Sequence, residues 1–321
     1  MKNFVLIGAA GYVAPRHMAA IKNTGNQLIA ALDPSDSVGV IDKYFPDAAF
    51  FTEFERFDRH LEKFRQKGEN IDYVSVCSPN YLHDAHIRFG LRHGADVICE
   101  KPLVLNPWNL DALLKSQKES GKRVNNILQL RLHPSVAALK KKVNEAPKDK
   151  KWEIDLTYIT SRGKWYYASW KGVLEKSGGI ATNIGIHFFD VLIWIFGSVK
   201  DNIVHIHSHD RASGYLKLDR ANVKWFLSIN RATLPSELKK NKQTTYRALK
   251  IEDEEFEFSG GFNDLHLLSY QNILENKGFD IQEGSKAIEL VYEIRKDKGV
   301  GIGPNAHILA SLPLEKHPFE K

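Results

Sequence analysis

The chain has 321 residues, of which 43% are hydrophobic and 26% charged, as is ordinary for a folded soluble protein. This length exceeds the usual size of one hydrophobic core, so two domains are expected. The formal net charge of +6 suits an anionic ligand such as a nucleotide or sugar phosphate, and it fits a surface with spare lysines equally well. The basic runs stand beside acidic residues in one short stretch, which argues against nucleic-acid binding.

Cysteine content and hydropathy indicate the cellular compartment in which the protein is expected to work. Cys77 and Cys99 are the two cysteines, and we expect buried, reduced thiols, as in a cytoplasmic protein. No group of metal ligands stands at short spacing, so no metal site is expected. The N-terminus leads straight into a strand without a signal-peptide pattern. The longest apolar run, Phe188 to Phe196, is shorter than the roughly 18 residues of a membrane span and contains Asp190, so no membrane partner is expected.

In the first part of the chain, short apolar runs alternate with helical patterns. Strands are predicted at 4–7, 28–33, 73–77 and 96–100, and helices at 17–22, 81–93 and 110–120. Apolar strands with helices between them imply a parallel sheet that is covered on both faces. Residues 1–130 are therefore predicted to form a doubly wound α/β domain of the Rossmann type.

The pattern changes after the lysine-rich stretch 140–151. Strands are predicted at 152–158, 203–208, 223–229, 248–251 and 256–259, and helices at 185–196, 264–275 and 285–296. Residues 131–321 are accordingly predicted to form an α+β domain with a large, mainly antiparallel open sheet. Such an open sheet face is a common oligomerisation surface.

A glycine turn follows the first strand and reads Gly8-Ala9-Ala10-Gly11-Tyr12-Val13-Ala14. It matches the dinucleotide pattern G-x-G-x-x-G/A imperfectly, and alone it could be a simple strand-to-helix turn. Asp33 ends the next strand, where an acid binds the adenosine ribose and repels a 2′-phosphate. The sequence therefore predicts NAD rather than NADP, held by residues that include Gly8, Gly11, Tyr12, Val13 and Asp33.

Three further stretches complete a family pattern. They are Ser78-Pro79-Asn80-Tyr81-Leu82-His83, Glu100-Lys101-Pro102-Leu103 and Gly178-Gly179-Ile180-Ala181-Thr182-Asn183-Ile184-Gly185-Ile186-His187-Phe188-Phe189-Asp190. Together with the glycine turn, they resemble the Gfo/Idh/MocA oxidoreductases, which are NAD(P)-dependent sugar and polyol dehydrogenases. The chain departs from the family pattern at Ser177, where a glycine is common, and at Asn183, where an aspartate is common.

Within this family, the chain resembles the WlbA/WbpB branch most in its opening through Arg16-His17, in Asn183, and in its tail from Pro304 to Phe319. That resemblance implies oxidation of the 3-hydroxyl of UDP-N-acetyl-glucosaminuronic acid in the synthesis of surface polysaccharide (lipopolysaccharide O-antigen) sugars. It also implies a homotetramer or homodimer, 2-oxoglutarate as an acceptor that recycles the cofactor in some relatives, and a cis bond before Pro102.

Two residues are the catalytic candidates. Lys101 follows a strand carboxyl end, where ligands of open α/β sheets bind, and its ammonium would stabilise an alkoxide. A desolvated lysine can also have a lowered pKa and take the proton itself. His187 matches the family histidine and suits acid–base work, with Asp190 three residues on. Asn183 in place of an acid leaves the base role to Lys101 and His187, and the sequence does not decide between them.

The remaining candidates follow from their positions in these motifs. The resemblance implies that Ser78, Pro79, Asn80, His83, Glu100, Lys101 and Gln129 contact the cofactor. It implies that Arg16, Lys101, Arg162, Tyr166, Asn183 and His187 contact the substrate. For Asn80 and His83, a helix cap and a surface histidine are equally plausible, and the basic-aromatic stretch from Arg162 to Lys171 could instead pack on a neighbouring subunit.

Two alternatives stay open. The same enzyme could act on a free sugar or inositol, which the dependence of binding on the nucleotide would reveal. A non-catalytic NAD-binding regulator could have the same fold, because a fold does not determine a function. Retention of both Lys101 and His187 argues against the regulator.

Overall fold

The computed structural model describes residues 1–252, 254–256 and 264–320. The chain folds into two units, each with its own sheet. Unit 1 comprises the described residues of Met1–Leu132 and Asn263–Ser285, and unit 2 those of His133–Phe262 and Lys286–Lys321. The chain therefore leaves unit 1 and later returns to it. The single boundary expected after residue 130 does not include this return.

Unit 1 is built on a six-stranded parallel sheet with the strand order β3-β2-β1-β4-β5-β6. Its strands are β1 (Asn3–Ile7), β2 (Gln27–Leu32), β3 (Ala49–Phe51), β4 (Tyr73–Val76), β5 (Asp96–Cys99) and β6 (Val124–Asn126). The predicted doubly wound α/β class is confirmed. β3 has three residues, all of them half-buried, so it lacks the apolar run that marked the other strands.

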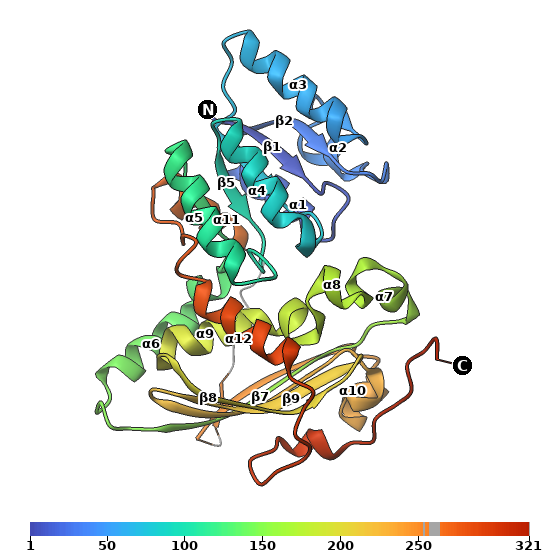
Figure 1. The fold of residues 1–321 in the computed structure, drawn as a ribbon, viewed down its shortest axis with the longest axis vertical. Helices are drawn as coiled ribbons and strands as arrows, with labels where there is room; N and C mark the ends of the chain where they lie inside the picture. Colours follow the sequence, from blue (N-terminus) through green and yellow to red (C-terminus); the bar gives the residue numbers. More distant parts are fainter. Residues whose placement is uncertain (253, 257–263, 321) are drawn as a thin grey trace. The chain divides into compact units, whose positions relative to one another are not determined.

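Helices cover both faces of this sheet (Figure 1). They are α1 (Ala14–Asn23), α2 (Val40–Tyr44), α3 (Phe54–Gln66), α4 (His83–Arg92), α5 (Trp108–Ser120) and α11 (Leu265–Leu274). Met18 of α1 and Tyr270 of α11 belong to one buried cluster with Phe4 and Leu6 of β1. The α3 and α4 helices meet through Phe57 and Phe89, whose ring centroids are 5.8 Å apart. The returning helix α11 thus completes the cover of unit 1.

Unit 2 is built on a mixed, mainly antiparallel sheet with the order β12-β11-β7-β10-β9-β8, in which the β7 and β10 pair is parallel. Its strands are β7 (Trp152–Thr160), β8 (Val199–His207), β9 (Arg211–Leu218), β10 (Ala221–Ser228), β11 (Thr245–Ile251) and β12 (Glu254–Glu255). The sequence analysis missed β9, which contains Gly214. A Cβ on Gly214 would lie 2.5 Å from the Trp225 ring, so the glycine marks close packing and not a turn.

Helices α6 (Pro134–Glu145), α9 (Ile186–Phe196) and α12 (Ser285–Lys296) lie against one face of this sheet (Figure 1). Phe189 of α9 packs on Trp225 at 5.3 Å between ring centroids. Shorter helices are α7 (Lys164–Ala168), α8 (Leu174–Ser177) and α10 (Ser236–Lys240). α6 extends into the first half of the lysine-rich stretch 140–151, for which the sequence analysis predicted no element. The predicted strand 256–259 extends into residues that lie outside the described part of the chain, except for Phe256.

The helical stretch Leu174–Phe196 is the one segment of the described residues that is long and apolar enough to cross a membrane, with a mean hydropathy of 1.6 in its 18-residue window. The sequence analysis counted only the unbroken run 188–196 and missed it. Of that window, 72% is buried. Burial of this extent is typical of a core helix of a soluble protein, and the packing of α9 on the sheet fits that explanation.

Candidate functional site

The glycine turn connects β1 to α1 and has the close backbone packing that the motif predicts. Gly8 has a φ of +94°, and its N–H donates to the carbonyl oxygen of Leu32 at 2.8 Å. A Cβ on Gly8 would lie 2.6 Å from the backbone of Cys77 and Ser78, so only glycine fits without a shift. Val13 is the N-cap of α1, and no acidic residue stands in the first turn of that helix. The N-terminal end of α1 therefore has the positive end of the helix dipole and no carboxylate that would repel an anion, although the N–H groups of Ala14 and Arg16 already donate to the carbonyls of Gly11 and Val13.

Asp33 lies at the end of β2 and is bound to this turn. Its Oδ2 accepts the N–H of Ala10 at 2.9 Å, and its Oδ1 accepts the N–H of Ser35 at 2.9 Å. The two bonds fix the carboxylate beside the glycine turn. The acid that is predicted to bind the adenosine ribose thus lies beside the glycine turn.

The loop after β4 carries Ser78, Pro79 and Asn80, and it is tied to helix α4 by two imidazoles. Ser78 Oγ lies 2.8 Å from Nδ1 of His86. His83 lies between two carbonyl oxygens, with Nε2 2.8 Å from that of Ser78 and Nδ1 2.7 Å from that of Pro102. Burial lowers the pKa of His83 despite these contacts, and burial lowers the pKa of His86 to about 4. His83 is fully buried, so it is not the surface histidine that the sequence analysis left as an alternative.

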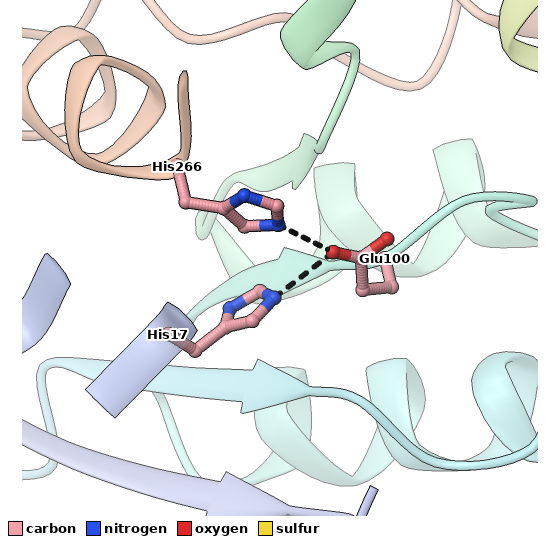
Figure 2. Close-up of side chains that lie close together, drawn as sticks. All are labelled: His17, Glu100 and His266. Atoms are coloured by element: carbon pink, nitrogen blue, oxygen red, sulfur yellow. Dashed lines mark hydrogen bonds and ion pairs between the residues drawn. The ribbon is translucent and has the colours of Figure 1, made fainter. Parts of the chain in front are cut away.

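Lys101 follows β5, and its peptide bond to Pro102 is cis, as the family resemblance implied. The preceding residue, Glu100, is only 4% exposed. Its Oε1 accepts from Nε2 of His17 at 3.0 Å and from Nε2 of His266 at 2.9 Å (Figure 2). Its Oε2 accepts the backbone N–H of Lys101 at 3.2 Å. Both carboxylate oxygens thus have protein partners.

Burial alone would raise the pKa of Glu100, but the hydrogen bonds from His17 and His266 outweigh it and hold the pKa well below its usual range. The carboxylate is therefore ionised and can only accept. Burial lowers the pKa of His17, so its ring is neutral. The single N–H of the neutral His17 ring points at Glu100, so Nδ1 accepts a hydrogen bond from the Tyr270 hydroxyl, 2.8 Å away. The Tyr270 oxygen in turn accepts a hydrogen bond from the Ser75 hydroxyl, 2.7 Å away.

The sequence analysis missed this buried network because its members come from α1, β4, the end of β5 and α11. His17, Glu100 and His266 offer ligand atoms within 4.8 Å of one another, a set that could hold a metal ion. The expectation that no such group exists rested on short spacing, and the tertiary structure brings together residues that are far apart in the chain. One signal was present: His266 and Tyr270 stand four residues apart on the predicted helix 264–275, and such residues share a face.

Other predicted residues of unit 1 have different surroundings. Gln129 begins a short 3₁₀ helix, Gln129–Leu132, that follows β6. Arg131 in that helix is buried and forms an ion pair with Glu283 at 2.9 Å. Arg16 is exposed on α1, and its guanidinium carbon lies 5.8 Å from the centroid of the Tyr12 ring. Arg16 and Tyr12 are thus accessible to a solute.

In unit 2, the predicted residues gather around the start of α9. A π-helical turn, Ala181–Gly185, precedes that helix and contains Asn183. The Nδ2 of Asn183 donates to the hydroxyl of Tyr166 at 2.7 Å. Asn183 and His187 are both half-buried, whereas Tyr166 is only 2% exposed. The structure therefore joins Asn183 and Tyr166 directly, and it places His187 four residues further along.

Two charged residues of the basic-aromatic stretch, Arg162 and Lys171, lie close enough to interact electrostatically, and Arg162 also acts on Tyr166. Arg162 is exposed, and its backbone N–H donates to the carbonyl of Ile229 at 2.8 Å. Lys171 is half-buried, and its pKa is lowered by burial and then by the charge of Arg162. Two cations that repel each other in this way are suited to an anionic ligand.

Solved structures that are similar to this chain include two crystal structures of the WlbA (WbpB) dehydrogenase from Thermus thermophilus. The first, a complex with NAD and alpha-ketoglutarate, is 46% identical, with a TM-score of 0.92 over 96% of this chain and 99% of the other. The second, a complex with NAD and UDP-GlcNAcA, is 45% identical, with a TM-score of 0.91 over 95% of this chain and 98% of the other.

Two family models match the chain. Residues 2–127 match the GFO_IDH_MocA model, described as an oxidoreductase family with an NAD-binding Rossmann fold. Residues 150–234 match GFO_IDH_MocA_C, the C-terminal alpha/beta domain of that oxidoreductase family. The chain belongs to the Gfo/Idh/MocA oxidoreductases.

Among curated Gfo/Idh/MocA relatives, the putative oxidoreductase YteT of Bacillus subtilis is 24% identical over 211 residues, which are 63% of this chain and 48% of YteT. The chain thus spans about half the length of the first curated relatives it matches. Membership in the family establishes the fold, the oxidoreductase class and the NAD-binding nature of the N-terminal domain.

Proposed function

We propose that the protein is an NAD-dependent dehydrogenase that oxidises the 3-hydroxyl of UDP-N-acetyl-glucosaminuronic acid to a ketone. The near full-length match to the Thermus thermophilus dehydrogenase, whose crystals hold NAD and UDP-GlcNAcA, carries this proposal. A complex of the same dehydrogenase holds alpha-ketoglutarate. We therefore include 2-oxoglutarate as the proposed acceptor that reoxidises the cofactor.

The residues of unit 1 fit NAD. The turn at Gly8 has no room for a side chain, the first turn of α1 lacks an acid, and Asp33 is held beside the turn. We propose that the backbone of the glycine turn and the positive N-terminal end of α1 bind the pyrophosphate and that Asp33 binds the adenosine ribose. Bound NAD supplies the hydride acceptor. The other proposed cofactor residues are unchanged: Gly11, Tyr12, Val13, Ser78, Pro79, Asn80, His83, Glu100, Lys101 and Gln129. Because both carboxylate oxygens of Glu100 have protein partners, Glu100 would affect the cofactor through the residues that it holds.

Lys101 and His187 are the proposed catalytic residues. A positive charge on Lys101 would stabilise the alkoxide that develops as the C3 hydroxyl loses its proton. A neutral His187 would accept that proton, and a neutral Lys101 could accept it instead. Asn183 supports this division of roles because it donates an amide N–H to Tyr166 and brings no carboxylate to the start of α9.

The charge of the substrate agrees with the cations available to it. A UDP-sugar acid has two phosphates and a carboxylate, and Arg16 and Arg162 are both exposed. We propose that they bind these anionic groups, because a guanidinium can form two parallel hydrogen bonds to a phosphate or carboxylate. Tyr166, Asn183, Lys101 and His187 complete the proposed set of substrate residues.

We further propose that the protein acts in the cytoplasm, in surface polysaccharide synthesis, as a homotetramer or homodimer that associates through the sheet of unit 2. Cys77 and Cys99 are free thiols and fully or nearly fully buried, which suits a reducing compartment. Light scattering on the eluting protein would measure the oligomer.

The decisive experiment incubates the purified protein with UDP-N-acetyl-glucosaminuronate, NAD and 2-oxoglutarate, and follows the 3-keto sugar and 2-hydroxyglutarate by mass spectrometry. Omission of 2-oxoglutarate separates enzyme that releases NADH from enzyme that recycles it. Two matched substrates serve as controls. One is the same sugar acid without its UDP group, and the other is UDP-N-acetylglucosamine, which lacks the carboxylate. Preferred turnover of a free sugar, inositol or the uncharged nucleotide sugar would refute the substrate assignment.

Variants test the two catalytic residues. K101A and H187A should each abolish most turnover while leaving NAD affinity near that of the wild type. Lys118→Ala, on the exposed side of α5, is the matched control and should retain full activity. Unchanged turnover in K101A or H187A would remove that residue from the mechanism.

A further inference from the structure

Lys101 stands between two residues that buried imidazoles hold in place. Glu100, on its N-terminal side, accepts hydrogen bonds from His17 and His266. Pro102, on its C-terminal side, has its carbonyl oxygen 2.7 Å from Nδ1 of His83. All three histidines are at most 2% exposed. The backbone on either side of Lys101 is therefore fixed by side chains that solvent does not reach.

We propose that His17 and His266 are positioning residues for the reaction, which act on Lys101 through the ionised carboxylate of Glu100. This inference rests on the catalytic role of Lys101 in the proposed function. The link is direct in the structure: one oxygen of Glu100 binds both imidazoles, and the other accepts the backbone N–H of Lys101 (Figure 2).

The polarity of the network supports this role. A carboxylate only accepts, so each imidazole must direct its Nε2 hydrogen at Glu100. The neutral ring of His17 then accepts from Tyr270, which accepts from Ser75. Each of these bonds has one allowed direction, so the network has a single ordered arrangement that holds Glu100 in one position.

His266 belongs to the segment of the chain that returns to unit 1. His266 and Tyr270 both lie on α11, the helix that the chain contributes after it has built the sheet of unit 2. His17 lies on α1, the helix that follows the glycine turn. The network thereby connects the glycine-turn helix, the returning helix and the residue before Lys101.

The network must be weighed against a metal site formed by the same three ligands. The hydrogen-bonded arrangement requires no added ion, because the Nε2 atoms lie at ordinary hydrogen-bond distances of 3.0 and 2.9 Å from Oε1. A Zn²⁺ titration of the purified protein by calorimetry distinguishes the two. One equivalent of tightly bound Zn²⁺ that is lost in H266L would overturn the proposal, and its absence supports the hydrogen-bonded network.

His266 is the best position for a variant. Its Nδ1 is buried and has no hydrogen-bond partner among the described residues, so a replacement there removes a single hydrogen bond, together with the edge contact of its ring on His17. H266Q retains an N–H donor near the position of Nε2, whereas H266L removes it. Glu100→Gln, which keeps the shape and removes the charge, is the second variant. His93→Gln is the matched control. His93 also pairs with a carboxylate, that of Asp58, but it precedes β5 and so lies at the opposite end of that strand from Lys101.

We expect H266L and E100Q to lower kcat by roughly 10- to 100-fold, the scale of a displacement near 1 Å in a catalytic group. In H266L, KM for the UDP-sugar acid and Kd for NAD should change by less than about threefold, because a positioning defect acts on the chemical step. H266Q should recover most of kcat, and H93Q should match the wild type. A folded H266L with unchanged kcat, or H266Q and H266L that are equally impaired, would overturn the proposal.

A second measurement separates this inference from the proposed function. Reductive ¹³C-methylation labels the lysines, and the Lys101 signal is identified by its absence in K101R. We expect that signal to shift or broaden in H266L and to return in H266Q, whatever the substrate is. An enzyme that is inactive on UDP-N-acetyl-glucosaminuronate but shows this pattern would refute the proposed function alone, and an unchanged Lys101 signal in H266L would refute the positioning role.

Discussion

Acid should destabilise unit 1 through His86, a buried histidine on α4 that lies within hydrogen-bond distance of Ser78. His86 is 9% exposed, its ring stacks on Phe54 at 5.7 Å between centroids, and burial lowers its pKa to about 4 from 6.5. The unfolded chain therefore binds a proton below pH 6.5 that the folded chain does not bind until the pH nears 4. The contribution is complete above pH 6.5 and is lost progressively as the pH falls.

The size of the effect follows from this shift. Between pH 7.5 and pH 5, the difference in proton binding lowers the free energy of unfolding by about 2 kcal/mol for His86 alone. The matched variant is His86→Asn, whose amide can replace Nδ1 as the partner of Ser78 and does not titrate in this range. H86N should lose some stability at pH 7.5, since it lacks the stacked ring, but its stability should depend less on pH.

Hydrogen exchange on peptides from β4 and β5 is the appropriate assay, because it reports the opening free energy of unit 1 alone in a chain with two units. The wild-type value should fall between pH 7.5 and 5 by about 2 kcal/mol more than the H86N value. Equal pH slopes in the two proteins would refute the assignment of a neutral, buried His86. The other histidines of unit 1 are common to both proteins, so their titration cancels in the comparison.

Three further predictions concern the glycine turn, Asp33 and a buried ion pair of unit 2. Gly8→Ala should lower stability by more than about 2 kcal/mol and weaken NAD binding in calorimetry, because of the positive φ and the clash with Cys77; a variant as stable as the wild type would contradict this. Asp33→Ser should weaken NAD binding about tenfold and reduce the discrimination against NADP in the same titration, and unchanged selectivity would remove Asp33 from the cofactor site. Arg211→Met should cost about 3–5 kcal/mol in hydrogen-exchange stability of β9, because the buried Asp210 loses its partner at 2.9 Å; adding Asp210→Asn should restore part of that loss, and the absence of such recovery would contradict the ion-pair explanation.

The features that local sequence determined are those that depend on short-range pattern. Buried parallel strands gave unbroken apolar runs, so β1, β2, β4 and β5 were predicted together with the Rossmann class. The glycine at residue 8 was predictive because a positive φ and close backbone approach leave few other choices. Two strands could not be predicted. β3 has only three residues and lacks an apolar run. β9 contains Gly214, whose glycine is required by its packing on Trp225 in another strand.

The network around Glu100 shows what only the tertiary structure decided. The motif singled out Glu100 and Lys101, but nothing near them in the chain indicated that Glu100 would be buried between His17 and His266. Those imidazoles reach it because α11 returns to unit 1 after the chain has built a second sheet. A buried carboxylate needs donors, and the chain supplies them from wherever folding brings a helix face against the end of β5. The sequence by itself therefore determined which residue types surround Lys101 locally, and the fold decided which distant side chains hold them in place.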